Sequence, residues 1–153
     1  MNSRRQPVLI LMAEDDEEDR YLAQEAFEEA HLANHFQFVE DGEALMDYLY
    51  RRGKYAHLDD SVQPGLILLD LNMPRKDGRE ALREIKADPA LRRIPVVILT
   101  TSQAEEDIFR TYDLGANSYI TKPVTFTALV ALMTSLKHYW FEIVALPLDD
   151  TEK

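Results

Sequence analysis

The sequence predicts one doubly wound α/β domain, with helices on both faces of a parallel β-sheet. Five short apolar runs alternate with segments whose apolar residues recur at helical spacing. Runs that are apolar at nearly every position are typical of strands buried on both faces, and parallel strands need helical crossovers between them. A length of 153 residues fits a single domain of this kind.

The first half of the chain supplies three of the strands and two helices. In order, we expect a strand at 8–13, a helix after the acidic residues 14–19, a strand at 36–39, a helix that opens at Asp41-Gly42, a loop at 53–64 and a strand at 65–69. The helices are predicted because their apolar positions recur every three or four residues. The loop is predicted from its glycine, proline and polar residues.

The second half adds two strands and three helices. In order, we expect a helix at about 78–87, a strand at 95–99 that ends on Thr100, a helix at about 104–114, a short strand around Tyr119-Ile120 and a helix from about Phe126 to beyond Trp140. Met73-Pro74 separates the third strand from its helix. Gly115 is a residue type suited to end the preceding helix.

The composition excludes several classes of protein. The chain has 17 Lys+Arg and 28 Asp+Glu, and its formal net charge of −11 disfavours binding to nucleic acid. It has no cysteine, so disulfides, thiolate catalysis and cysteine-based zinc sites are ruled out. No apolar stretch approaches the ~20 residues that cross a bilayer, and we expect a cytoplasmic protein with no membrane partner. None of its 5 glycines forms a dinucleotide-binding, P-loop or G-x-S-x-G motif.

Charged and hydroxyl side chains follow four of the five predicted strands. These are Glu14, Asp15 and Asp16 after the first strand, Asp70 after the third, Thr100 at the end of the fourth and Lys122 after the fifth. Open α/β sheets bind their ligands beyond the carboxyl ends of the strands. We therefore expect these side chains to meet at one edge of the sheet.

This set of side chains favours phosphoryl chemistry with a divalent cation. Two carboxylates ~4 Å apart repel each other by about 4 kcal/mol at an effective dielectric constant of about 20, so three of them need a cation or a shifted pKa. Mg²⁺ prefers such hard oxygen ligands and accepts phosphate as a further ligand. Lys122 and Thr100 can hold phosphoryl oxygens, and Asp70 can attack phosphorus to form an acyl phosphate. The sequence therefore predicts magnesium-assisted phosphoryl transfer onto Asp70.

Each of these residues also has an ordinary structural explanation. The acidic residues 14–19 could be the solvated first turn of a helix, Asp70 a turn former and Lys122 a surface lysine. Their joint placement, at the ends of separate strands, is what favours a site. His31 and His35 are spaced as in a zinc-binding helix but lack its acidic residue, and we expect them to be surface or packing residues.

Together these segments resemble the receiver domain of two-component response regulators. The resemblance rests on Val8–Asp16, Leu66–Pro74 with Asp77-Gly78, Pro95–Thr100 and Tyr119–Pro123, within a likeness that spans about residues 6–140. It implies a flavodoxin-like fold with strand order 2-1-3-4-5, a receiver domain at 6–145 and a C-terminal tail at 146–153. Such a receiver leaves no room for an output domain, so we expect the signal to leave by protein contact.

The resemblance also implies the phosphoryl and metal ligands. Asp70 would accept the phosphoryl group from a sensor histidine kinase, and Lys122 would bind that group, with a cis peptide bond to Pro123. Glu14, Asp15, Asp70 and the backbone carbonyl of Asn72 would hold Mg²⁺. Asp16 could replace Asp15 as a ligand, because the register at the end of the first strand is ambiguous.

Signalling would depend on a further set of residues. By the same resemblance, Thr100 and Tyr119 would form the switch pair, and Asn72 and Ser102 would tune the lifetime of the phosphoryl group. A second resemblance, to the small stand-alone regulators of bacterial phytochromes, rests on Arg52–Tyr55, Arg75–Glu80 and the tail. It implies a bacteriophytochrome as the kinase.

The last helix and the tail predict a homodimer. Apolar residues occupy more than one face of this segment, and a surface of that kind is usually covered. The residues beyond the one stripe that packing on the sheet requires are Val130, Leu132, Tyr139, Phe141, Ile143, Val144, Leu146 and Leu148. A tail folded back on its own domain is the alternative.

Two other functions fit parts of the pattern. A haloacid-dehalogenase-like phosphatase also uses an aspartyl phosphate, but it carries D-x-D after its first strand, where this chain has Glu14-Asp15-Asp16. A binding module that never accepts phosphate is the other alternative, and the retention of Thr100 and Lys122 beside the acidic residues argues against it. We therefore expect no enzyme in the usual sense, but a phosphoacceptor that catalyses its own phosphorylation and slow dephosphorylation.

Overall fold

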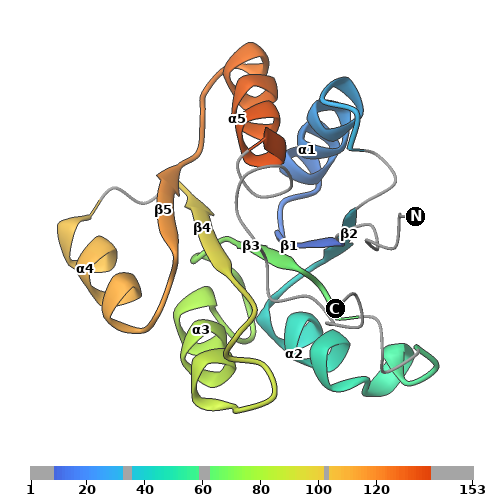
Figure 1. Ribbon diagram of the computed structural model, residues 1–153, viewed down its shortest axis with the longest axis vertical. Helices are drawn as coiled ribbons and strands as arrows, with labels where there is room; N and C mark the ends of the chain where they lie inside the picture. Colours follow the sequence, from blue (N-terminus) through green and yellow to red (C-terminus); the bar gives the residue numbers. More distant parts are fainter. Residues whose placement is uncertain (1–8, 33–35, 59–62, 102–103, 139–153) are drawn as a thin grey trace, which may run out of the picture.

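A parallel β-sheet lies between two layers of helices in the computed structural model, which describes residues 9–32, 36–58, 63–101 and 104–138 (Figure 1). Within these residues, five strands pair in the order β2-β1-β3-β4-β5, all parallel. The strands are β1 (Ile10–Ala13), β2 (Phe36–Val39), β3 (Leu66–Leu69), β4 (Val96–Thr100) and β5 (Ser118–Thr121). The helices are α1 (Glu17–Glu29), α2 (Gly42–Tyr50), the short 3₁₀ helix η2 (Gly53–Tyr55), α3 (Gly78–Ala87), α4 (Glu105–Asp113) and α5 (Phe126–His138).

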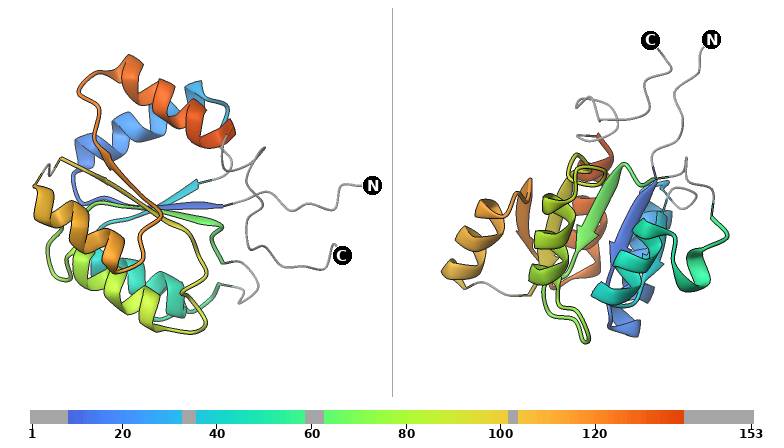
Figure 2. Two further views of the ribbon diagram at one scale, coloured as in Figure 1. Left: turned by 60° about the vertical axis from the view of Figure 1, so that its left-hand side comes forward. Right: turned by 90° about the horizontal axis from the view of Figure 1, so that it is seen from below.

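The helices divide between the two faces of the sheet. Helices α1 and α5 cover one face, whereas α2 and α3 cover the other and α4 lies beside β5 (Figure 2). Successive strand residues point to opposite faces, so that in β3 Leu68 packs in the α1/α5 layer and Leu69 in the α2/α3 layer. Every residue of β1, β3 and β4 is buried. Burial on both faces is the reason that these strands are continuous apolar runs in the sequence.

Aspartates fix where three of the helices begin. Asp16, Asp41 and Asp77 cap α1, α2 and α3, and each accepts a hydrogen bond from a backbone N–H of the first turn. The cap of α3 is reciprocal, because the side chain of Glu80 accepts a hydrogen bond from the backbone N–H of Asp77 at 3.2 Å. The first turns of these helices are therefore held by side chains of the loops that precede them.

The predicted fold class and strand order are confirmed, and the described elements match their predicted positions to within a few residues. One local difference is the helix η2, which occupies the beginning of the segment predicted as a loop at 53–64. Val8 and the residues from Tyr139 onward lie outside the described part of the chain. No helix in the described ranges is both long enough and apolar enough to cross a bilayer.

Candidate functional site

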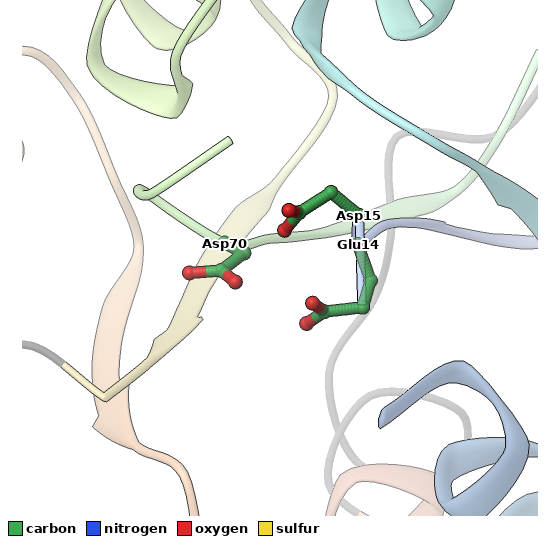
Figure 3. Close-up of side chains that lie close together, drawn as sticks. All are labelled: Glu14, Asp15 and Asp70. Carbon is green, nitrogen blue, oxygen red and sulfur yellow. The ribbon is translucent and has the colours of Figure 1, made fainter. Parts of the chain in front are cut away.

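Three carboxylates meet at the carboxyl ends of β1 and β3, where Figure 3 shows them directed toward one another. Glu14 and Asp15 follow β1, and Asp70 follows β3. One carboxylate oxygen from each lies within 4.8 Å of the others. Glu14 and Asp70 are buried, whereas Asp15 is exposed. The fold thus brings together residues that lie more than fifty positions apart in the chain.

The ammonium group of Lys122, which follows β5, supplies positive charge to this cluster. Its Nζ lies 2.6 Å from Glu14 Oε1, 2.8 Å from Asp19 Oδ2 and 3.2 Å from Asp70 Oδ2. An ammonium group has three protons to donate, so these three contacts use all of its capacity. The Lys122 side chain is only 14% exposed, and its ion pairs are therefore less screened than those of a surface lysine.

Burial and charge set the protonation of the cluster. Burial raises the pKa of the Glu14 carboxyl to about 7, and the charge of Asp70 adds to this rise, although the hydrogen bond from Lys122 opposes it. Burial would lower the pKa of the Lys122 ammonium, but its hydrogen bonds with Asp19 and Glu14 outweigh burial and raise that pKa. Lys122 therefore stays charged, whereas Glu14 takes up a proton near neutral pH unless further positive charge arrives.

The raised pKa of Glu14 predicts a pH dependence of stability in the metal-free protein. Glu14 binds its proton more tightly in the folded chain than at its ordinary pKa of 4.5, so the resulting stabilisation is complete below about pH 4.5 and is lost as the pH rises through about 7. This rise in the pKa of Glu14 corresponds to a change in the free energy of unfolding on the order of 3 kcal/mol between the two pH limits. Denaturation with urea at about pH 5 and about pH 8 measures the loss, with a metal chelator present to keep the protein metal-free. The Glu14→Gln variant should lose less stability over that interval, and equal losses would contradict the prediction.

The acidic residues 14–19 divide into separate structural roles. The Asp16 side chain accepts two backbone N–H hydrogen bonds at the start of α1, and the Asp16 backbone N–H donates to Glu14 Oε2 at 3.0 Å. Asp15 is therefore the residue that joins Glu14 and Asp70, while Asp16 is a helix cap. Asp19 was not among the predicted site residues, and its contact with Lys122 was not expected from the sequence. Its place three residues after an aspartate N-cap was the only available signal.

Thr100 and Tyr119 lie on neighbouring strands, on one face of the sheet. In the register of β4 and β5, Tyr119 pairs with Ile98, two residues before Thr100. Because residues two apart share a face, the two side chains project to the same side. Thr100 is fully buried, and Tyr119 is half-buried against the core. The backbone N–H of Tyr119 donates to Tyr112 Oη in α4 at 3.2 Å, which links β5 to that helix.

The loop between Asp70 and Gly78 is held tightly in place. The backbone N–H of Gly78 donates to the carbonyl of Leu71 at 2.9 Å, and a Cβ on Gly78 would lie 2.2 Å from the carbonyl oxygen of Asp70. Arg75 has a positive φ of 66° and its guanidinium lies 3.0 Å from Asp41 Oδ2. The position of the Asp70 carboxyl therefore depends on this close packing.

The remaining predicted residues have different outcomes. The backbone N–H of Asn72 donates to Asp70 Oδ1 at 3.2 Å, so this residue lies next to the carboxylates. The cis peptide bond expected before Pro123 is wrong, because no peptide bond among the described residues is cis. The trans isomer is the more stable form of such bonds by about 0.5–1 kcal/mol, and this loop adopts it. Ser102 lies outside the described residues.

The sequence is similar to those of known signalling proteins. The model of the response regulator receiver domain family matches residues 10–134. The chain is 43% identical over 141 residues to Response regulator Rcp1 of Synechocystis sp., and the match covers 92% of this chain and 94% of that protein.

Solved structures of such proteins resemble the fold described above. The phosphorylated cyanobacterial phytochrome response regulator RcpA is 44% identical with a TM-score of 0.84, and the match covers 93% of this chain and 99% of that chain. The Mn²⁺-bound form of Rcp1 is 42% identical with a TM-score of 0.81, over 92% of this chain and 99% of that chain. In both cases the similarity extends over more than nine tenths of each chain.

Proposed function

The chain belongs to the response regulator receiver family, and we propose that its Asp70 accepts a phosphoryl group from a sensor histidine kinase. One observation carries the proposal: the buried Asp70 carboxylate lies 3.2 Å from the Lys122 ammonium, and its oxygen lies within 4.8 Å of carboxylate oxygens of Glu14 and Asp15. The phytochrome response regulator RcpA is one of its relatives, and we propose a bacteriophytochrome as the kinase. A cytoplasmic location belongs to the same proposal, and the cysteine-free sequence is compatible with it.

Receiver domains bind a divalent metal ion, and the acidic residues here fit one. Oxygens from Glu14, Asp15 and Asp70, within 4.8 Å of one another, are hard ligands of the type that Mg²⁺ prefers. We propose Mg²⁺ as the ion, held by these three carboxylates and the backbone carbonyl of Asn72. When bound, the ion neutralises the negative charge of the carboxylates and of the phosphoryl oxygens.

The residues of the chain divide the work of phosphoryl transfer. A carboxylate oxygen of Asp70 attacks the phosphorus, an O–P bond forms, and the bond from phosphorus to the donor's nitrogen or oxygen breaks with its electrons on the donor. The Lys122 ammonium, already 3.2 Å from Asp70 Oδ2, pairs with a phosphoryl oxygen. The buried Thr100 hydroxyl donates to another, and its movement is passed to Tyr119 on the same face.

Replacing Asp15 by asparagine is expected to weaken binding of Mg²⁺ by more than about tenfold, because the ion loses a charged ligand. The matched control is Asp16→Asn, which removes the same charge from the adjacent residue but keeps a side chain able to cap α1. Titration with Mg²⁺ in a calorimeter measures both affinities. If Asp16→Asn loses as much affinity for Mg²⁺ as Asp15→Asn does, the assignment of Asp15 rather than Asp16 as the metal ligand is wrong.

Incubation with acetyl phosphate and Mg²⁺ tests the proposed function. Intact mass spectrometry should show the addition of one phosphoryl group, and peptide mapping after chemical reduction of the acyl phosphate should place it on Asp70. A chain that stays unmodified would favour the binding module that never accepts phosphate. Rapid turnover of small phosphate esters, without modification of the chain, would favour the phosphatase.

We propose that the signal leaves through protein contact, including a homodimer through the last helix and the tail. In the described part of α5, Met133 and Leu136 are buried, and Leu129, Val130 and Leu132 pack against the core of the same chain. The tail residues that the dimer requires, from Tyr139 onward, lie outside the described residues. Sedimentation of the protein before and after incubation with acetyl phosphate and Mg²⁺ tests whether phosphorylation changes its self-association.

A further inference from the structure

Lys122 has one acidic partner that the proposed phosphoryl and metal ligands leave unexplained. Asp19 Oδ2 lies 2.8 Å from the Lys122 ammonium, closer than the 3.2 Å to Asp70. Its side chain is 39% exposed, and it stands apart from the group of three carboxylates that meet around Asp70. Asp19 therefore contacts Lys122 without belonging to the group of three carboxylates, Glu14, Asp15 and Asp70.

The start of α1 explains why Asp19 can reach Lys122. Both α1 and α3 have an aspartate N-cap and an acidic residue three positions later. In α3 that residue, Glu80, turns back to accept the N–H of its own cap residue. In α1 the corresponding N–H, that of Asp16, instead donates to Glu14 Oε2 at 3.0 Å. The Asp19 carboxylate is therefore released from the usual capping role and extends to a lysine 103 positions away in the sequence.

We propose that Asp19 is a positioning residue that holds the Lys122 ammonium in the site throughout the phosphorylation cycle. The inference rests on the proposed function, because it concerns the lysine that would bind the phosphoryl group. Of the three partners of Lys122 among the described residues, Asp70 becomes an acyl phosphate and Glu14 contributes its charge to the cation. Asp19 is the partner whose carboxylate remains available to the ammonium at every stage.

Charge and exposure fit this role. A lysine that is 14% exposed needs a nearby anion to offset the loss of its hydration, and Asp19 provides one that does not change during the reaction. Its position in the first turn of α1 places its negative charge near the positive end of the helix dipole. Because Asp19 lies at the solvent side, its ion pair can lengthen slightly as the ammonium follows the phosphoryl oxygen.

The Asp19→Asn variant tests the proposal, with Glu18→Gln as the matched control. Both variants remove one negative charge from the first turn of α1, but only Asp19 contacts Lys122. With saturating Mg²⁺, we expect Asp19→Asn to take up a phosphoryl group from acetyl phosphate about tenfold more slowly. This is less than the roughly hundredfold loss that a 1 Å misplacement can cause, because Glu14 and Asp70 still contact the ammonium. Glu18→Gln should match the wild type. Asp19→Glu, which keeps a carboxylate, should recover part of the rate.

A second measurement separates positioning from a general loss of structure. In a Lys122→Met background, Asp19→Asn should cause no further decrease in rate, because its effect passes through the lysine. An Asp19→Asn variant that reacts as fast as the wild type, or faster, would overturn the inference, since a faster reaction means that Asp19 holds the ammonium back. If the wild type and Glu18→Gln are not phosphorylated on Asp70 at all, the proposed function itself fails.

Discussion

Replacement of Asp70 by asparagine is expected to abolish uptake of a phosphoryl group from acetyl phosphate while the chain stays folded. The amide has nearly the same shape as the carboxyl group but lacks the anionic oxygen that attacks phosphorus. Its carbonyl oxygen can still accept the hydrogen bond that Asp70 Oδ1 receives from the backbone N–H of Asn72. Lys122 keeps its contacts with Glu14 and Asp19. Intact mass spectrometry under the conditions that modify the wild type measures the loss.

The stability of the same variant gives an independent check. Asp70→Asn removes an ion pair with Lys122 but also removes a negative charge that faces Glu14. The two changes oppose each other, and Lys122 keeps two carboxylate partners. We therefore expect the free energy of unfolding without metal to fall by much less than the about 3–5 kcal/mol typical of breaking a buried ion pair. Asp113→Asn, at an exposed position at the end of α4, is the matched control and should be phosphorylated normally. Normal phosphorylation of Asp70→Asn would show that a residue other than Asp70 accepts the phosphoryl group.

The substitution Gly78→Ala is expected to have a large effect on stability. A Cβ at this position would lie 2.2 Å from the carbonyl oxygen of Asp70 and 2.7 Å from the Cα of Leu71, both backbone atoms that cannot rotate away. Helix α3 must then move off the end of β3, and the hydrogen bond from Gly78 N–H to Leu71 is weakened. We expect the free energy of unfolding to fall by about 3 kcal/mol, the upper part of the range for overpacking.

Chemical denaturation measures this loss, and phosphoryl uptake measures the displacement of Asp70. Gly53→Ala is the control: it has a positive φ of 56°, but its Cβ would meet no atom closer than 3.8 Å. It should lose only about 1 kcal/mol, the cost of a left-handed conformation for a residue with a side chain. Similar losses for the two variants would show that the loop after Asp70 yields easily, contrary to its close packing.

The fold can be predicted from the sequence because buried strands require apolar residues, and these residues are visible in the sequence as runs. The strands β1, β3 and β4 are buried at every position, and they appear as unbroken apolar runs. The start of α3 was also predictable, since Asp77 and Glu80 form a reciprocal cap with local sequence spacing. The parallel order of the strands then brings Glu14, Asp70 and Lys122 to one edge, which is why their proximity could be expected before any coordinates.

The finer arrangement of the site could not be predicted in this way. Six consecutive acidic residues follow β1, and a shift of one residue at the end of the strand exchanges the positions of Asp15 and Asp16. The contact of Asp19 with Lys122 depends on where α1 begins and on which carboxylate accepts the N–H of Asp16. Neither depends on sequence spacing alone, because both result from competition among several acidic groups for a few donors.

The sequence by itself thus determined the element order and which types of side chain stand at the ends of the strands. Apolar periodicity and helix capping depend on residues that are close together in the sequence, so both can be recognised in the sequence alone. Only the tertiary structure decided that Lys122 shares its three protons among Glu14, Asp19 and Asp70. The same packing decided that Gly78 fits closely against the backbone of Asp70. These contacts join segments distant in the chain, and their geometry is set by how the helices pack on the sheet.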